Sequence, residues 1–262
     1  MALRSVEDAL HYLLADAPKW GSELRDLAHS LGAVLAEDIV ANADVPAADN
    51  SAMDGYAIRY RDLQKGQPIP ISQRIPAGVV GDTLQPATAA RIFTGAFIPD
   101  GADTVIAQED CEVSGANVTV NVLASKGQHI RPRGQDISSG QRLLAAGHRL
   151  QAADLGLLAS LGIAQVAVSK VIKVALMSTG DELREPGEKL GQGQIYNSNR
   201  PMLAAMIRSL GCEVLDLGII ADDPQATKTA LERARDQADV VVSSGGGSVG
   251  EGGHVKAQGE AL

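Results

Sequence analysis

Several residue types are scarce in the chain, and each scarcity excludes a class of protein. Only two cysteines occur among the 262 residues, Cys111 and Cys212, and the five histidines are scattered. The cysteines form no CxxC pair, and the histidines show no HxH or HExxH spacing, which argues against a disulfide framework and a transition-metal centre. Aromatic residues make up 3% of the chain, so the cores must be built from Ala, Val, Leu and Ile.

Positive charge and long apolar runs are also lacking. The formal net charge is −9, whereas nucleic acids and anionic membranes are bound by basic surfaces. No apolar run approaches the roughly 20 residues that span a bilayer, and acids interrupt the apolar N-terminal stretch. We therefore expect a cytoplasmic protein with no nucleic-acid or membrane partner. A local basic pocket could still hold a small anion.

The first two thirds of the chain read as helical stretches around a β-rich segment. Ser5 and Asp8 form a capping-box pattern before a predicted helix over 6–16, and residues 23–39 predict a second helical piece broken by Gly32. Short β-type runs divided by Gly, Pro and Asp turns follow, and helical periodicity returns at 151–163. The pattern predicts a discontinuous helical linker domain over 1–43 and 131–168, with a β-rich domain inserted at 44–130.

The last third alternates strands and helices. The predicted elements are KVIKVALMS, SNRPMLAAMIRSLG, CEVLDLGII, DPQATKTALERARDQA and DVVVSS, in that order. Asp223 and Pro224 occupy the N-cap and first-turn positions of the second helix. Because such alternation implies parallel strands with right-handed crossovers, we expect residues 169–262 to form a partial parallel α/β domain. The fold class is multidomain α/β.

A glycine-rich loop follows the third predicted strand. Gly245, Gly247 and Gly250 match G-x-G-x-x-G, but the dinucleotide fingerprint belongs to a first βα turn, and no Lys-Ser/Thr pair marks a P-loop. The glycines could simply make a tight turn. Three in a row beside Ser244 and Ser248 exceed what a turn needs, so we favour an anion-binding loop.

A second polar loop, STGDELREPGEKL, follows the first strand of the α/β part. Ser178, Thr179 and Gly180 could hydrogen-bond a phosphate, whereas Asp181 and Glu182 could either cap a following helix or hold a divalent cation. Residues 197–199, Asn-Ser-Asn, precede a helix, and one of them is expected to be an N-cap. Polar loops at neighbouring strand ends predict one crevice.

The β-rich part carries further polar turns. Asp54 lies in DNSAMDGYAIR, which is typical of Asx-turn chemistry, and Thr94 lies at a strand end in RIFTGA. Arg131 and Arg133 flank a proline near Asp136 in RPRGQDI. The two arginines could form an oxyanion-binding fork, or the segment could be a solvated loop.

These motifs together resemble one known family. NSAMDGYAIR, RIFTGAFIPDGADTVIAQED, RPRGQDI, STGDEL, GQIYNSN and SSGGGSVGE, in this order and spacing, resemble the molybdopterin molybdenumtransferases, which include the E domain of gephyrin. The resemblance implies insertion of molybdate into adenylylated molybdopterin with release of AMP in a Mg²⁺-dependent step. It also implies a homodimer whose site lies between the α/β domain of one subunit and the inserted domain of the other, and the adenylyltransferase that makes the substrate as a partner.

The resemblance also assigns roles to residues. The implied catalytic residues are Asp54, Thr94, Asp136, Glu182 and Asp222, with Glu182 and Asp181 as ligands of Mg²⁺. The implied cofactor-binding residues are Ser178, Thr179, Gly180, Asp181, Asn197, Ser198, Asn199, Ser244, Gly245, Gly246, Gly247, Ser248, Arg131 and Arg133. Molybdenum would be captured by the pterin dithiolene, which fits the lack of Cys and His ligands.

The chain departs from the family pattern after SVGE. Gly253 stands where the family has an acid, and of the expected lysines only Lys256 is near. The family's C-terminal β-barrel is also expected to be absent. We therefore expect either a molybdenumtransferase or, as the alternative, a catalytically impaired module that binds a pterin or nucleotide or serves as a scaffold.

Overall fold

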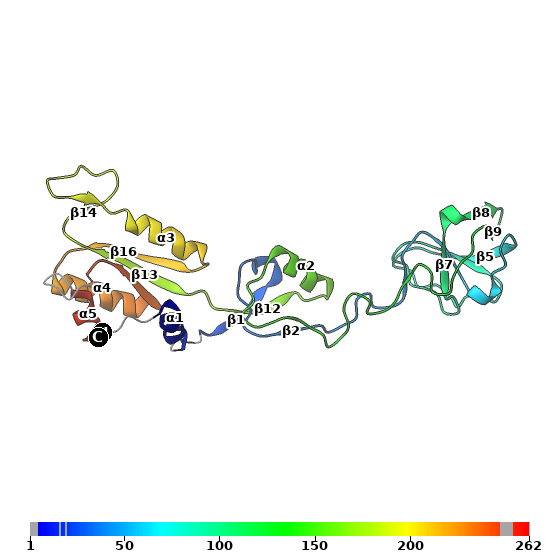
Figure 1. Ribbon diagram of the computed structural model, residues 1–262, viewed down its shortest axis with the longest axis horizontal. Coiled ribbons are helices and arrows are strands. Elements are labelled where there is room, and N and C mark those ends of the chain that lie inside the picture. The colour runs from blue at the N-terminus through cyan, green and yellow to red at the C-terminus, as the bar shows by residue number, and fades with distance from the viewer. Residues whose placement is uncertain (1–4, 16, 19, 247–253, 262) are drawn as a thin grey trace. The chain divides into compact units, whose positions relative to one another are not determined.

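The computed structural model describes residues 5–15, 17–18, 20–246 and 254–261 (Figure 1). They form two compact units. Unit 1 comprises Met1–Ala36, Arg149–Gln151 and Gln165–Leu262, and unit 2 comprises Glu37–His148 and Ala152–Ala164. Within the described residues, no helix has the length and apolar character that crossing a membrane requires.

Unit 1 is built around a parallel sheet with helices on both faces. Its elements are α1 (Val6–Ala15), β1 (Ser22–Asp26), η1 (Leu27–His29), β12 (Gln165–Ser169), β13 (Lys173–Thr179), β14 (Leu183–Arg184), β15 (Ile195–Tyr196), α3 (Asn199–Ser209), β16 (Glu213–Ile220), α4 (Pro224–Gln237), β17 (Val240–Ser244) and α5 (His254–Glu260). The sheet order is β16-β13-β17, with both pairings parallel, as the sequence predicts.

β13 is the central strand because nearly all of its side chains are apolar or small. Figure 1 shows α3 and α4 on opposite sides of the sheet. Successive side chains of a strand point to opposite faces, so Val174 and Leu176 pack against α3, whereas Met177 packs against Ala230 and Leu231 of α4. A strand covered on both faces reads as a continuous apolar run, which is why KVALM predicts it.

Two predicted helix starts are confirmed. The Asp8 N–H donates to Ser5 Oγ at 3.0 Å at the start of α1, and the Asp223 carboxylate accepts the Ala226 N–H at 2.7 Å at the start of α4. In both cases the side chain satisfies an N–H that the first turn leaves without a helical partner.

The helical piece predicted over residues 23–39 is wrong. Residues of this stretch form β1 and the short η1, and β1 pairs antiparallel with β12, with Ser22 opposite Ser169. Leu35 is buried and bridges Val168 of the same ribbon. The apolar spacing resembles a helical period, but pairing with a strand distant in sequence overrides that local preference.

Unit 2 contains the β-rich fold. Its elements are β2 (Ile39–Val40), β3 (Asn50–Ser51), β4 (Gly55–Ile58), η2 (Tyr60–Asp62), β5 (Pro68–Ile75), β6 (Ala89–Ile92), β7 (Thr104–Ala107), η3 (Gln108–Asp110), β8 (Cys111–Ser114), β9 (Asn117–Val120), β10 (Ile130–Arg131), β11 (Arg142–Leu144) and α2 (Ala152–Ser160). Six strands form one sheet in the order β7-β4-β6-β5-β9-β8.

Two apolar clusters fill the two sides of this sheet. Tyr56 and Ile106 belong to one cluster, and Ala57 and Val105 belong to the other, as the alternation along β4 and β7 requires. Gly55 is required by packing, because a Cβ there would lie 1.9 Å from the Ile106 carbonyl oxygen. The close approach of β7 fixes the start of β4, and Asp54 immediately precedes that start.

Candidate functional site

The carboxyl end of β13 carries two polar side chains that are removed from solvent. Ser178 is fully buried and Thr179 is 7% exposed. Ser178 Oγ has no hydrogen-bond partner among the described residues, and the same is true of Nδ2 of the buried Asn197. Buried polar atoms without partners are costly, so these two groups point to a polar ligand or to bound water in this region.

The glycine loop after β17 passes very close to Thr179. A Cβ at Gly245 would lie 2.7 Å from the Thr179 carbonyl oxygen, and one at Gly246 would lie 2.7 Å from Thr179 Oγ1. The φ angles of Gly245 and Gly246 are +100° and +65°, which other residues rarely adopt. These glycines thus bring bare backbone to the end of the neighbouring strand. The predicted Gly247 and Ser248 lie outside the described residues.

The start of α3 joins the same region. The Asn199 amide donates to Ser244 Oγ at 3.1 Å, which links the first turn of α3 to the end of β17. Ser198 occupies the predicted N-cap position of α3 but makes no capping bond with its side chain, and Asn197 Oδ1 instead accepts the Arg200 N–H at 3.2 Å. This bond uses the side-chain oxygen of Asn197, so its amide nitrogen Nδ2 can still donate a hydrogen bond.

The acidic residues after β13 and β16 also meet. The Asp222 N–H donates to Asp181 Oδ1 at 3.1 Å, which joins the loops that follow these two strands. Glu182 folds back over Gly180, since a Cβ at Gly180 would lie 2.5 Å from Glu182 Oε2. No helix begins here, because Leu183 and Arg184 form β14, so the capping alternative for Asp181 and Glu182 is wrong.

Arg200 organises the long loop between β13 and α3, a role that sequence reasoning missed. Its guanidinium bonds the carboxylates of Glu185 in the loop and, at 2.8 Å, Asp216 in β16. Burial raises the pKa of Asp216, but the hydrogen bonds from Arg200 and the Gly218 N–H outweigh it and leave that pKa below its ordinary value. The pairing was not readable from spacing, because sixteen residues separate the partners.

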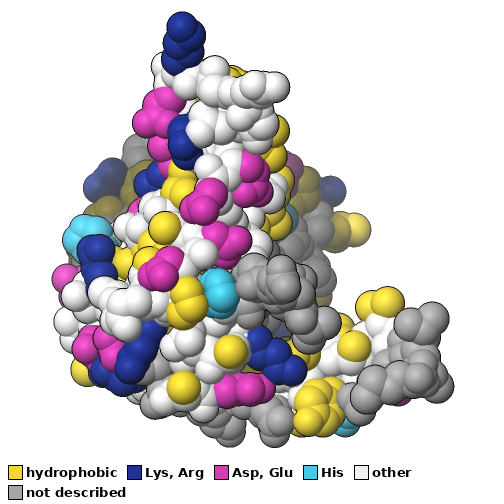
Figure 2. Space-filling model, turned by 90° about the vertical axis from the view of Figure 1, so that its left-hand side faces the viewer, with side chains coloured by type: hydrophobic (Ala, Val, Ile, Leu, Met, Phe, Trp, Pro, Cys, Tyr) yellow, Lys and Arg dark blue, Asp and Glu magenta, His cyan; other side chains and the backbone are white. Residues whose placement is uncertain are grey.

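The loops that carry these groups follow β13 and β16 on the left of Figure 1, and Figure 2 looks onto that side. Acidic and basic side chains are interspersed over this surface (Figure 2). Anion binding here would therefore depend on amides and hydroxyls at the carboxyl ends of β13 and β17, the region in which the sequence predicts a crevice. Backbone N–H groups at strand ends suit an anionic ligand.

Unit 2 brings Asp54 and Thr94 together. The backbone N–H and the hydroxyl of Thr94 both donate to Asp54 Oδ1, each at 2.8 Å. Both bonds hold the pKa of the Asp54 carboxyl below its ordinary value, and the bond from the backbone N–H has the larger effect. Asp54 therefore stays ionised over the physiological range.

The predicted arginine pair is bound to acids of the chain. Arg131 Nη2 lies 2.7 Å from Asp136 Oδ2, and Arg133 Nε lies 2.6 Å from Asp44 Oδ2. β10 pairs with β3, so Arg131 lies opposite Asn50 in the segment that leads to Asp54. The RPRGQD and NSAMDGY motifs thus share one part of unit 2, and an anion-binding fork would compete with these ion pairs.

Two arginines pack against the Phe93 ring, an arrangement that the sequence did not predict. The guanidinium carbons of Arg74 and Arg91 lie 4.5 and 4.6 Å from the Phe93 ring centroid. Arg91 donates to the Gly55 carbonyl at 3.0 Å and contributes to the lowered pKa of Asp54. Arg91 lies within the RIFTGA motif, and this position is the sequence feature that could have pointed to its role.

Comparison with known proteins shows which protein families and relatives this chain resembles. Residues 4–162 match the family described as the MoeA N-terminal region (domain I and II), and residues 175–262 match the description "Probable molybdopterin binding domain". Two curated relatives bear the name molybdopterin molybdenumtransferase. The protein from Haemophilus influenzae is 42% identical over 90% of this chain, and that from a Nostoc species is 39% identical over 94%.

The chain spans about three fifths of each of these relatives, 59% of their length. Among solved structures, a molybdopterin biosynthesis MoeA protein from Pyrococcus horikoshii matches with a TM-score of 0.86 and 34% identity. That match covers 100% of this chain and 67% of the other. The comparison therefore extends over both units.

Proposed function

The chain belongs to the MoeA family, the molybdopterin molybdenumtransferases, and on that premise we propose that it acts in molybdenum cofactor biosynthesis by inserting molybdate into adenylylated molybdopterin with release of AMP. The observation that carries the proposal is the set of polar and glycine residues at the carboxyl end of β13 in unit 1. The bare backbone of Gly245 and Gly246, the Thr179 hydroxyl and the unpartnered Ser178 Oγ lie where β13 and β17 end. The second unpartnered group, Asn197 Nδ2, precedes the helix whose first turn bonds Ser244.

The crevice residues would bind the phosphates of the substrate. Backbone amides of Gly245 and Gly246 can approach a phosphate oxygen closely because these residues have no side chain. Ser178 Oγ and Asn197 Nδ2 can each donate a hydrogen bond, and a ligand acceptor would relieve the cost of burying them without a partner. Molybdate enters as a substrate, and its dianionic charge suits the same kind of donors.

The donor set fits Mg²⁺ held jointly by protein and substrate. No group of three or more His, Cys, Asp or Glu side chains within the described ranges could hold a metal ion alone. Mg²⁺ commonly takes only one or two carboxylates and completes its octahedron with phosphate oxygens and water. Asp181 and Glu182 would be those carboxylates. When bound, the ion would neutralise charge that develops on the departing AMP phosphate.

The residues of unit 2 would complete the site from a second subunit. Asp54 is ionised and fixed by Thr94, and Asp136 is held by Arg131, so both carboxylates are oriented before substrate arrives. In this proposal a homodimer brings them to the crevice of the partner, and the adenylyltransferase that produces the substrate is a further partner. Preorganised groups add to catalysis because they need no rearrangement during the reaction.

The test is AMP release. Adenylylated molybdopterin, molybdate and Mg²⁺ are incubated with the 262-residue chain, and AMP is quantified by chromatography against a reaction without molybdate. We expect molybdate-dependent release that Glu182→Gln abolishes and exposed Glu112→Gln preserves. Substrate binding without release would identify a binding module in place of the enzyme, and absence of both would refute the proposal.

A further inference from the structure

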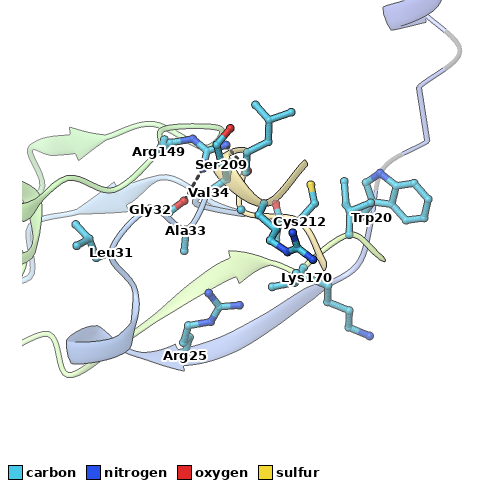
Figure 3. Close-up of a pocket in the computed structure, with 16 residues that line it drawn as sticks. Trp20, Arg25, Leu31, Gly32, Ala33, Val34, Arg149, Lys170, Ser209 and Cys212 are labelled. Atoms are coloured by element: carbon cyan, nitrogen blue, oxygen red, sulfur yellow. Dashed lines mark hydrogen bonds between the residues drawn. The ribbon is translucent and has the colours of Figure 1, made fainter. Parts of the chain in front are cut away.

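Unit 1 contains a cavity at the edge of the sheet opposite the predicted crevice. Its volume is about 540 Å³, and its lining includes Ile172 and Cys212, the residues immediately before β13 and β16. The predicted crevice is at the carboxyl ends of these parallel strands, whereas this cavity lies at their amino ends. Figure 3 shows its lining residues. The volume is in the range of small-molecule sites.

The lining of this cavity is cationic in an acidic protein. Arg25, Arg149, Lys170 and Arg208 line it, and no Asp or Glu is among the lining residues that the structure describes, although the whole chain carries a net charge of −9. The four cations come from β1, the segment before α2, the residue after β12 and the last turn of α3. Cations gathered from four segments raise the local potential for an anion.

Two of these cations already serve the fold. Arg25 is paired with Glu23 at 2.5 Å. Arg149 donates to the Gly32 carbonyl at 2.8 Å and the Leu210 carbonyl at 3.2 Å, and so ties the two walls of the cavity together (Figure 3). Lys170 and Arg208 form no ion pair within the described part of the chain, and they are the groups left to meet a ligand.

The remaining lining is apolar and includes an aromatic ring. Trp20 stands at one side of the cavity and is 36% exposed (Figure 3). Leu31, Val34 and Val171 add aliphatic surface. An indole face stacks on planar rings, and guanidinium and ammonium groups bind phosphate oxygens. The combination is suited to a ligand with a planar body and an anionic end.

We propose that this cavity binds a small organic phosphate of the mononucleotide class, with the ring against Trp20 and the phosphate between Lys170 and Arg208. The proposal is independent of the molybdenum-transfer function, because no lining residue belongs to the crevice. The proposal concerns binding only, and no covalent bond of the ligand is formed or broken. A ligand here would touch β12, β13 and α3 at once and would stabilise unit 1 by mass action.

Trp20 is the only tryptophan of the 262-residue chain and therefore reports on this cavity alone. AMP is titrated into the full chain while Trp20 emission is recorded with excitation beyond the adenine absorption band. We expect a saturable change in emission, a much weaker response to adenosine, and reversal by inorganic phosphate. The crevice does not contain Trp20, so AMP bound there leaves the signal unchanged.

Substitution of the two cations tests whether they bind the phosphate of the ligand. Arg208→Gln and Lys170→Gln are each expected to weaken AMP binding about ten- to hundredfold, the usual effect of losing a hydrogen bond to a charged group. Arg235→Gln is the matched control, because Arg235 lies in the last turn of α4 as Arg208 does in α3. Lys65→Gln controls for Lys170, and circular dichroism verifies that each variant is folded.

Three results would overturn the proposal. They are a constant Trp20 emission up to the solubility limit of AMP, an equal response to adenosine, and an equal affinity of the Arg208→Gln and Arg235→Gln variants. Failure of AMP release in the transferase assay would leave these readings intact, so the two proposals stand or fall separately.

Discussion

Thr94 donates two hydrogen bonds to a single oxygen of Asp54, one from its backbone N–H and one from its hydroxyl. The arrangement fixes both the orientation and the charge of that carboxylate. Only one of the two donors belongs to a side chain, so a substitution can remove it and leave the other in place.

Thr94→Val is expected to raise the pKa of Asp54 partway toward its ordinary value. Valine keeps the shape of threonine but not its hydroxyl, and the stronger backbone contribution remains. Carbon NMR of the Asp54 carboxyl across an acid titration measures the change. Thr94→Ser retains the hydroxyl and is expected to titrate like the parent chain, and an unchanged pKa in Thr94→Val would contradict the assignment.

Ser178→Ala is expected to leave the free energy of unfolding unchanged or slightly higher while weakening substrate binding. Ser178 Oγ has no partner among the described residues, so its removal costs no internal hydrogen bond. Urea unfolding and the AMP-release assay measure the two effects. Ser243→Ala is the matched control, because Ser243 Oγ donates to the Gly245 carbonyl at 2.9 Å and its loss should cost about 0.5–1.5 kcal/mol.

Gly245→Ala is expected to destabilise the chain by about 1–3 kcal/mol, the usual cost of a strained backbone position. The φ of +100° and the 2.7 Å approach of the added Cβ to the Thr179 carbonyl oxygen both oppose the substitution. Gly259→Ala, in α5 with open space around it, should instead be neutral or stabilise by up to about 1 kcal/mol. Equal unfolding midpoints for the two variants would be inconsistent with a closely packed glycine loop.

Arg200→Met is expected to lower the free energy of unfolding by about 1–2 kcal/mol at neutral pH, because two carboxylates lose their shared partner. The pKa of Asp216 is lowered in the folded chain. The stabilisation is therefore present above the unfolded pKa and disappears as the pH falls through the folded pKa. Urea unfolding at pH 7 and in acid measures the difference.

The gap between the parent chain and Arg200→Met should close in acid. Arg61→Met is the control, since Arg61 is 75% exposed and lies 3.8 Å from Asp62. Its free energy of unfolding should stay within about 0.5 kcal/mol of the parent value at both pH values. A gap for Arg200→Met that is independent of pH would show that packing, rather than the ion pairs, accounts for the loss.

The α/β part was predictable because its signals are local. The apolar run of β13, the Asp223-Pro224 start of α4 and the glycines after β17 each depend on neighbouring residues only. The meeting of the loops after these strands followed from the general rule that parallel strands end at one edge, whereas the crevice itself stays a prediction. The family motifs named Asp54 and Thr94 among the implied catalytic residues, but their contact is visible only in the structure.

The features that the sequence could not predict depend on contacts between residues that are far apart in the chain. β1 was read as helical because its pairing with β12 lies beyond any local window. The bonds from Arg200 to Glu185 and Asp216, and that from Asn199 to Ser244, join segments whose proximity only the folded chain creates. The ion pairs of Arg131 and Arg133 likewise depend on β3 and its neighbours lying beside β10.

The placement of unit 2 within the sequence of unit 1 has a consequence for synthesis on the ribosome. Unit 2 is nearly continuous in the chain and can form all its contacts once residue 164 has emerged. β1 must wait for β12, because Asp26 and its partner Gln165 are 139 residues apart. β13 then waits for β16 and finally for β17. Translation therefore delivers a finished β-rich unit first, and the sheet that holds the crevice closes last.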